Sequence, residues 1–184
     1  NIHSLTLEAI TNTDHLPKCE ISENHLFFTL KYPTYNDEKN FLELKHISLI
    51  LSHHYLITLQ EGTEDYMTVI KERIKNARGR VRQKNIEYLF YIILDFIVDQ
   101  YFYIMDKIRD KIEDTEDLLM DEPEENHIKT IHLIKKRIVY LRKYITSLNK
   151  SVSTLLNNEM PFLDDNVKIY IRDVYDHTIH INES

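Results

Sequence analysis

The chain contains few residues that cross-link or interrupt a fold. Its 184 residues include one cysteine, two glycines, four prolines and no tryptophan. The single cysteine, Cys19, excludes an intrachain disulfide and favours a reducing, cytosolic setting. The scarcity of glycine and proline, together with 42% hydrophobic and 29% charged residues, excludes a collagen-like or disordered chain. A helix-rich globular protein is expected.

Three further absences limit the function. No apolar run reaches the ~18–20 uninterrupted residues of a membrane span. The most apolar stretch, 89–105, contains Asp95 and Asp99, which would each cost roughly 2.5–3.5 kcal/mol to insert. The net charge of -7 argues against nucleic acid as the main partner. The sequence has no phosphate-binding loop, CxxC, HExxH or nucleophile–base pair, so we do not expect an enzyme.

The longest pattern predicts one helix over 85–121. Its first half is apolar on all sides except at the two aspartates and Gln100. Its second half keeps a narrow apolar stripe, with helical spacing, at Ile104, Ile108, Ile112, Thr115 and Leu119. At 1.5 Å per residue this helix would be roughly 55 Å long, so its apolar half should lie in a globular body and its charged half should project as a stalk.

The next helix, predicted over 124–157, has a heptad pattern. Its apolar positions are Ile131, Ile134, Ile138, Leu141, Ile145, Leu148, Val152 and Leu155. This spacing predicts a coiled-coil-like antiparallel pair with the stalk helix. Charge supports the pairing, because residues 106–126 hold ten acids and three bases whereas residues 129–143 hold six bases and no acid. An acidic tip is expected at 121–125.

The first 60 residues have strand periodicity after a short helix at 4–13. Two hairpins are predicted, 19–22 with 25–32 and 41–51 with 55–60, which favours a largely antiparallel sheet. Leu42 and Leu44 share one strand parity while Ile47, Leu49 and Leu51 share the other, so we expect a bulge near Lys45-His46.

Two more helices are predicted. One covers 65–82 and overlaps a stretch, 71–84, with seven basic residues and one acid, which we interpret as a solvated or internally paired face. The other begins at 164–165 and has an apolar seam at Val167, Ile171, Val174, Thr178 and Ile181. This pattern has no stop signal before the chain ends, so the chain is expected to be a piece of a longer protein. The expected division is an α/β subdomain at 1–84, truncated at its start, and a helical stalk subdomain at 85–184, cut within its final helix.

Acidic and imidazole side chains at helical spacing are candidate metal ligands. Asp95 and Asp99 are one turn apart, as are Asp173 and His177. Carboxylate sets favour Mg²⁺ or Ca²⁺, whereas imidazole also admits Co²⁺, Ni²⁺ or Zn²⁺. The alternatives are a buried carboxylate that accepts a hydrogen bond and an Asp–His contact on the surface. Glu8 and Asp14, which flank the first short helix, are further candidates.

Several segments resemble one known family. The stretch IRDVYDH at 171–177, LTLEAITNTDHLPK at 5–18, RIKNARGRVRQK at 73–84 and YIILDFIVDQYF at 91–102 occur in the order found in the CorA magnesium transport proteins. This resemblance implies an α+β fold: part of an α/β/α sandwich with a largely antiparallel sheet, plus a long antiparallel helical stalk. It also implies the cytoplasmic domain of a homopentameric divalent-cation channel. The full-length channel would be held in the membrane by C-terminal helices that are absent here, with Mg²⁺, Co²⁺ or Ni²⁺ as the cation.

The resemblance further implies regulatory metal sites between neighbouring subunits. Asp173 matches a ligand from the final helix, Asp95 one from the long helix and Glu8 one from the first helix, with His177 beside them. Ala9 departs from the pattern, because the family commonly has an aspartate there, and Asp14 stands where some relatives carry histidine. Two alternatives remain: a domain of a related zinc transporter, and a helical-hairpin adaptor that binds another protein along the 104–155 seam.

Overall fold

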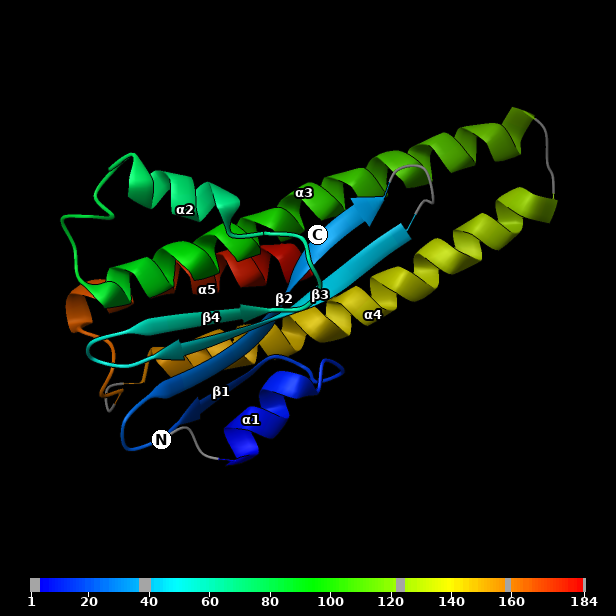
Figure 1. Cartoon of the computed structure of the whole chain (residues 1–184). Helices are drawn as coiled ribbons and strands as arrows, with labels where there is room; N and C mark the ends of the chain where they lie inside the picture. The colour runs from blue at the N-terminus through cyan, green and yellow to red at the C-terminus, as the bar shows by residue number, and fades with distance from the viewer. Residues whose placement is uncertain (1–3, 37–40, 122–124, 158–159, 184) are drawn as a thin grey trace.

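The computed structural model describes residues 4–36, 41–121, 125–157 and 160–183, and its elements follow the predicted order (Figure 1). In chain order they are α1 (Ser4–Thr11), β1 (Lys18–Ile21), β2 (Leu26–Asn36), β3 (Phe41–Leu51), β4 (Leu56–Gln60), α2 (Thr68–Lys75), α3 (Ile86–Asp121), α4 (Glu125–Leu155) and α5 (Asp165–Glu183).

The four strands form one antiparallel sheet in the order β1-β2-β3-β4. Both predicted hairpins are confirmed. β2 is longer than the predicted strand at 25–32, because residues 33–36 of the polar loop expected over 33–40 continue the strand. The remainder of that loop, 37–40, lies outside the described residues.

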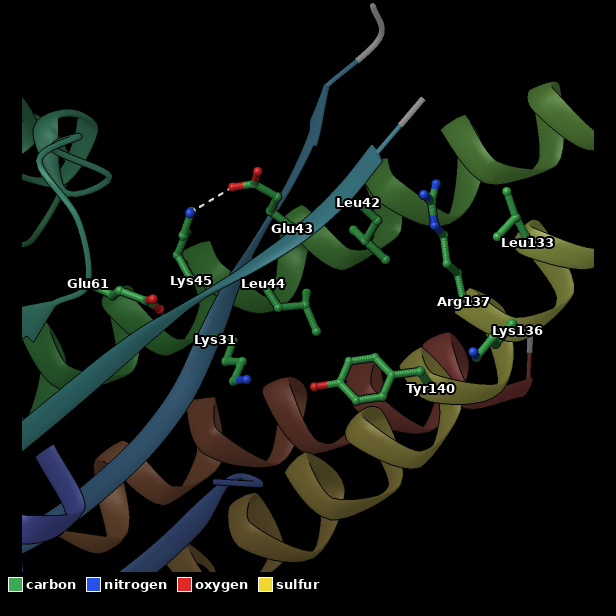
Figure 2. A pocket seen from close by; sticks show the side chains of 10 residues that line it. All are labelled: Lys31, Leu42, Glu43, Leu44, Lys45, Glu61, Leu133, Lys136, Arg137 and Tyr140. Atoms are coloured by element: carbon green, nitrogen blue, oxygen red, sulfur yellow. Dashed lines mark ion pairs between the residues drawn. The ribbon is translucent and has the colours of Figure 1, made fainter. Parts of the chain in front are cut away.

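The predicted bulge near Lys45-His46 is wrong. β2 and β3 pair without interruption from Leu26↔Leu51 to Asn36↔Phe41. The apolar residues change from one face of the strand to the other because the far end of this hairpin runs between α3 and α4 (Figure 1). Each face of the hairpin therefore meets a helix. Leu42 and Leu44 point toward α4 (Figure 2), so no extra residue is needed to bury them.

The main core lies between the sheet and the helices α3, α4 and α5. The sheet contributes Phe28, Leu30 and Leu49, which are at most 1% exposed. Phe28 meets Phe90 of α3 edge to face, with ring centroids 6.1 Å apart. On the opposite face of the sheet, Ala9 of α1 packs with Phe27 and Ile50 in a separate small cluster. The helices and the sheet thus form layers, with α1 on its own side.

The apolarity of α3 is explained by this core. By length and composition alone, Ile86–Leu119 could cross a membrane. In the folded chain, however, Leu94, Ile97, Val98 and Tyr101 are completely buried in contact with the other elements. The helix is therefore the central core element of this domain.

The stalk pairing is confirmed. α3 and α4 run antiparallel (Figure 1), and five of the predicted heptad residues are at most 1% exposed: Leu141, Ile145, Leu148, Val152 and Leu155. The two helices are not a simple coiled coil, since the β2–β3 hairpin reaches between them. The residues 122–124 of the predicted acidic tip lie outside the described residues.

The helix predicted over 65–82 is shorter in the structure. α2 ends at Lys75, and Ala77 adopts a positive φ of 51°. A left-handed residue at this position ends a helix, and alanine gives no sequence signal for it. In contrast, all five predicted seam residues of α5 are buried. The main core joins residues from before and after position 85, and the expected division there stays a prediction.

Candidate cation-binding site

Four of the predicted ligands converge where α5 packs along α3. The apolar residues of both helices determine this placement. On α5, Ile171, Val174 and Thr178 are buried, so the neighbouring positions Asp173 and His177 project along the edge of the helix interface. On α3, Ile97 and Val98 are buried in the core, which leaves Asp95 and Asp99 on the flank.

The four side chains are close, but they are not hydrogen-bonded. His177 Nδ1 lies 3.7 Å from Asp99 Oδ1, and His177 Nε2 lies 3.9 Å from Asp173 Oδ2. Ligand atoms of Asp95, Asp173 and His177 all lie within 4.8 Å of one another. Directly bound Mg²⁺ ligands sit at about 2.0–2.1 Å, so small side-chain rotations or bridging waters would complete a coordination sphere. These four residues, Asp95, Asp99, Asp173 and His177, are called the acidic cluster below.

Two carboxylates of the acidic cluster, Asp95 and Asp99, are costly to ionise. Burial raises the pKa of Asp95, and the charges of Asp99 and Asp173 raise it further, while His177 and Arg73 oppose the shift. Burial also raises the pKa of Asp99, with His177 opposing and Asp173 adding to the shift. A divalent cation would remove this penalty, because a nearby positive charge favours the ionised form.

Two aromatic residues near the acidic cluster were not predicted as part of it. Phe102 meets the His177 ring edge to face at 5.6 Å. Tyr91 has a raised pKa, caused first by burial and then by the Asp95 carboxylate. Tyr91 precedes Asp95 by four residues and Phe102 follows Asp99 by three, so helical spacing places all four on one side of α3. This helical spacing is the sequence signal from which Tyr91 and Phe102 could have been predicted as neighbours of the two aspartates.

Removal of the Asp95 charge is expected to stabilise the chain at neutral pH. The raised pKa means that ionisation disfavours the folded state, so the stability present below pH 3.8 is lost as the pH rises through the higher folded pKa. At pH 7, Asp95→Asn should therefore increase the free energy of unfolding by roughly 0.5–1 kcal/mol, the size of charge interactions at partly exposed sites. Urea unfolding of both proteins in metal-free buffer measures this change in the free energy of unfolding.

The gain from Asp95→Asn should vanish near pH 3, where the wild-type carboxyl is protonated. Asp176→Asn, on the exposed face of α5, is the matched control and should change stability little at either pH. Equal effects of the two substitutions at pH 7 would mean that the acidic cluster stores no repulsion.

The remaining predicted ligands lie elsewhere. Glu8 is exposed on α1, and Asp14 is exposed in the turn that follows, where its backbone N–H donates to Asn12 Oδ1. Because α1 covers the face of the sheet opposite to α3 and α5, one chain does not bring them to the acidic cluster. Ala9 is 3% exposed and contacts Phe27 and Ile50. An aspartate there would bury a carboxylate against apolar side chains, which is costly.

The chain is similar to known proteins in sequence and in fold. A family model described as CorA-like Mg²⁺ transporter protein matches residues 1–184. The chain is 38% identical over 183 residues to the cobalt/magnesium transport protein CorA of Thermotoga maritima, covering 100% of this chain and 52% of that protein. It is 21% identical over 168 residues to the protein of the same description in Methanocaldococcus jannaschii, covering 90% of this chain and 52% of that protein. The chain thus spans about half the length of these two relatives.

Solved structures share the fold. The soluble domain of CorA from M. jannaschii superposes with a TM-score of 0.85 at 19% identity, covering 99% of this chain and 72% of that one. The ZntB cytoplasmic domain from Vibrio parahaemolyticus superposes with a TM-score of 0.77 at 13% identity, covering 100% of this chain and 71% of that one. The predicted α+β class is confirmed by these likenesses.

Proposed function

The chain belongs to the CorA family of Mg²⁺ transporter proteins, and we propose that it is the cytoplasmic, cation-sensing domain of a membrane Mg²⁺/Co²⁺ channel. The family is one of transporters and not of enzymes, as the sequence predicted. The name of the T. maritima relative supports cobalt and magnesium as the cations. The domain would lie at the cytoplasmic face of the cell membrane, attached to the membrane part of the full-length protein.

The acidic cluster carries this proposal. Three carboxylates and one imidazole meet from two helices, and the pKa values of Asp95 and Asp99 are raised by burial and by neighbouring carboxylates. A bound cation would neutralise the repulsion and hold α3 against α5. Loss of the cation would restore the repulsion and loosen this edge of the domain. That difference between states is what a sensor requires.

The ligand set suits Mg²⁺ and Co²⁺. Carboxylate oxygens with waters are the usual ligands of Mg²⁺, and the imidazole of His177 would add affinity for Co²⁺ or Ni²⁺. Mg²⁺ binding by a single chain should be weak, millimolar or weaker, because the ion takes few protein ligands and keeps its waters.

A homopentamer would bring further ligands. Glu8 and Asp14 are exposed on the far side of the sheet from the acidic cluster, so only a neighbouring copy can present them to it. In a ring of subunits, the α1 edge of one copy would face the α3–α5 edge of the next. Cation bound there would tie two subunits together.

The two alternatives have less support. A zinc transporter domain shares the fold, as the ZntB likeness indicates. Structural zinc sites, however, use cysteine and histidine ligands, and the acidic cluster has one histidine. An adaptor would expose an apolar stripe along 104–155. Instead Ile104, Ile108, Leu141 and Ile145 are buried within the chain.

Thermal unfolding of the chain in MgCl₂ and CoCl₂, at constant ionic strength, tests the proposal. A cation at about ten times its Kd should add about 1.4 kcal/mol of stability, equal to about 3–5 °C in Tm for a domain of this size. The Asp95→Asn/Asp173→Asn double variant should lose this response, because two of the four ligands lose their charge. Asp176→Asn should keep it. A response unchanged in the double variant would show that the cation binds elsewhere.

A further inference from the structure

A cavity of about 490 Å³ lies between the β2–β3 hairpin and α4 (Figure 2). Its volume is within the ~300–1,000 Å³ range of small-molecule sites. None of its lining residues belongs to the acidic cluster. The lining combines basic side chains with apolar ones, in a chain whose net charge is -7.

The first basic side chain is Lys31, on β2. The residue is only 7% exposed, and Figure 2 shows its side chain directed into the cavity, toward the Tyr140 ring. Its ammonium has no hydrogen bond or ion pair within the described part of the chain. The backbone is anchored, since the Tyr101 hydroxyl donates to Lys31 O at 2.6 Å. An ammonium that faces a cavity and pairs with no carboxylate of the described chain is available to an anion.

The charge of Lys31 acts on the residue paired with it across the strands. Lys31 and His46 are register partners on β2 and β3. The pKa of His46 is lowered, first by burial and next by the Lys31 charge. The Glu61 charge opposes this shift, so charges of both signs act at this position of the sheet.

A second cation faces the cavity from α4. Lys136 and Tyr140 are one helical turn apart and project into the same space (Figure 2). The acids at the rim have other partners. Glu43 pairs with Lys45 at 2.7 Å, and Glu61 Oε2 accepts the His46 backbone N–H at 2.9 Å. Neither glutamate therefore neutralises Lys31 or Lys136 by a direct ion pair.

Apart from Arg137 of α4, the rest of the lining is apolar and partly exposed. Leu42 and Leu44 come from β3, and Leu133 and Tyr140 from α4, where they are 55% and 47% exposed. Large apolar side chains left exposed around a concave site gain free energy when a ligand covers them. A tyrosine ring in addition offers a face for stacking.

From these observations we propose that the cavity binds a small organic phosphate, with Lys31 contacting the phosphate, Lys136 adding positive charge from the α4 side of the cavity, and Leu42, Leu44 and Tyr140 contacting a flat or apolar body. Lysine ammonium groups bind phosphate oxygens through charge-assisted hydrogen bonds. Bare inorganic phosphate would leave the apolar wall uncovered, and an uncharged nucleoside would leave the two ammonium groups without a partner. Both parts of the ligand are needed.

Isothermal titration calorimetry with AMP, UMP and phenyl phosphate, in EDTA-containing buffer, tests this site. We expect at least one of the three to bind at one site per chain, and at least tenfold more tightly than inorganic phosphate or adenosine. Lys31→Met and Lys136→Met should each weaken that binding at least fivefold. Methionine keeps the length of the side chain, and Lys136 is exposed, so at least the second variant should fold normally.

Lys135→Met is the matched control, since Lys135 is exposed on the same helix and does not line the cavity. It should change binding less than twofold. The proposal is overturned if none of the three phosphates binds below about 5 mM, or if Lys135→Met weakens binding as much as Lys136→Met. Because EDTA removes divalent cations, these results are independent of the acidic cluster and of the proposed sensing function.

Discussion

Tyr101→Ala is expected to destabilise the chain by about 3–5 kcal/mol, the range for deleting a large buried aromatic ring. Tyr101 is completely buried at the centre of α3 and stacks on the buried Tyr144 of α4, with ring centroids 6.0 Å apart. Its hydroxyl also donates to Lys31 O of β2. One side chain therefore links α3, α4 and the sheet. Urea unfolding at pH 7 measures the loss.

Two controls separate the contributions of Tyr101. Tyr101→Phe keeps the ring and removes only the hydrogen bond, so it should cost about 1 kcal/mol. Tyr103→Ala, at a position that is 53% exposed on the same helix, should cost about 0.5 kcal/mol or less. A loss below about 1 kcal/mol for Tyr101→Ala would mean that α3 and α4 are not held together through this ring.

His177→Ala is expected to weaken Co²⁺ binding at least tenfold while changing Mg²⁺ binding less than threefold. Imidazole nitrogen is a good ligand for Co²⁺, whereas Mg²⁺ takes oxygen ligands and water. In the acidic cluster His177 supplies the only nitrogen, and the three aspartates supply oxygens. The substitution should therefore change the selectivity of the site without removing it. Calorimetric titration of each variant with CoCl₂ and MgCl₂ gives both affinities.

His180→Ala is the matched control for this selectivity experiment. His180 is exposed one turn further along α5 and lies outside the acidic cluster. It should leave both affinities within twofold. If His177→Ala weakens Mg²⁺ and Co²⁺ equally, His177 does not coordinate the metal, and its effect comes from its packing on Phe102.

Long periodic patterns predicted most of the fold. Both ends of α3 and α4 and the start of α5 lie within about two residues of the predicted positions, because apolar stripes of two or more turns are a strong helix signal. The exceptions have local causes. The end of α2 depends on the left-handed Ala77, an uncommon conformation for a residue other than glycine. The predicted bulge is absent because both faces of the β2–β3 hairpin are covered, so a change of strand parity needs no extra residue.

Spacing alone predicted the acidic cluster in halves, whereas the family resemblance grouped Asp95, Asp173 and His177 with Glu8 between neighbouring subunits. Helical spacing identified Asp95 with Asp99, and Asp173 with His177, as pairs on one face of a helix. No sequence pattern states that α5 packs along α3 so that the two pairs meet, because that depends on tertiary contacts. The cavity at Lys31 was not predicted at all. Its lysine lies in a strand whose side chains are otherwise mostly apolar, and its burial is visible only in the folded chain.

Because α3 is one continuous helix, a tilt at the acidic cluster would displace its far end by a larger distance. Asp95 lies near its first quarter, and the same helix continues to Asp121 with no break, a span of about 39 Å at 1.5 Å per residue. A tilt of about 5° at the acidic cluster would displace the far end by roughly 3 Å over that length. A small tilt between two packed helices would thus become a movement large enough to change the packing of any element in contact with the far end of α3.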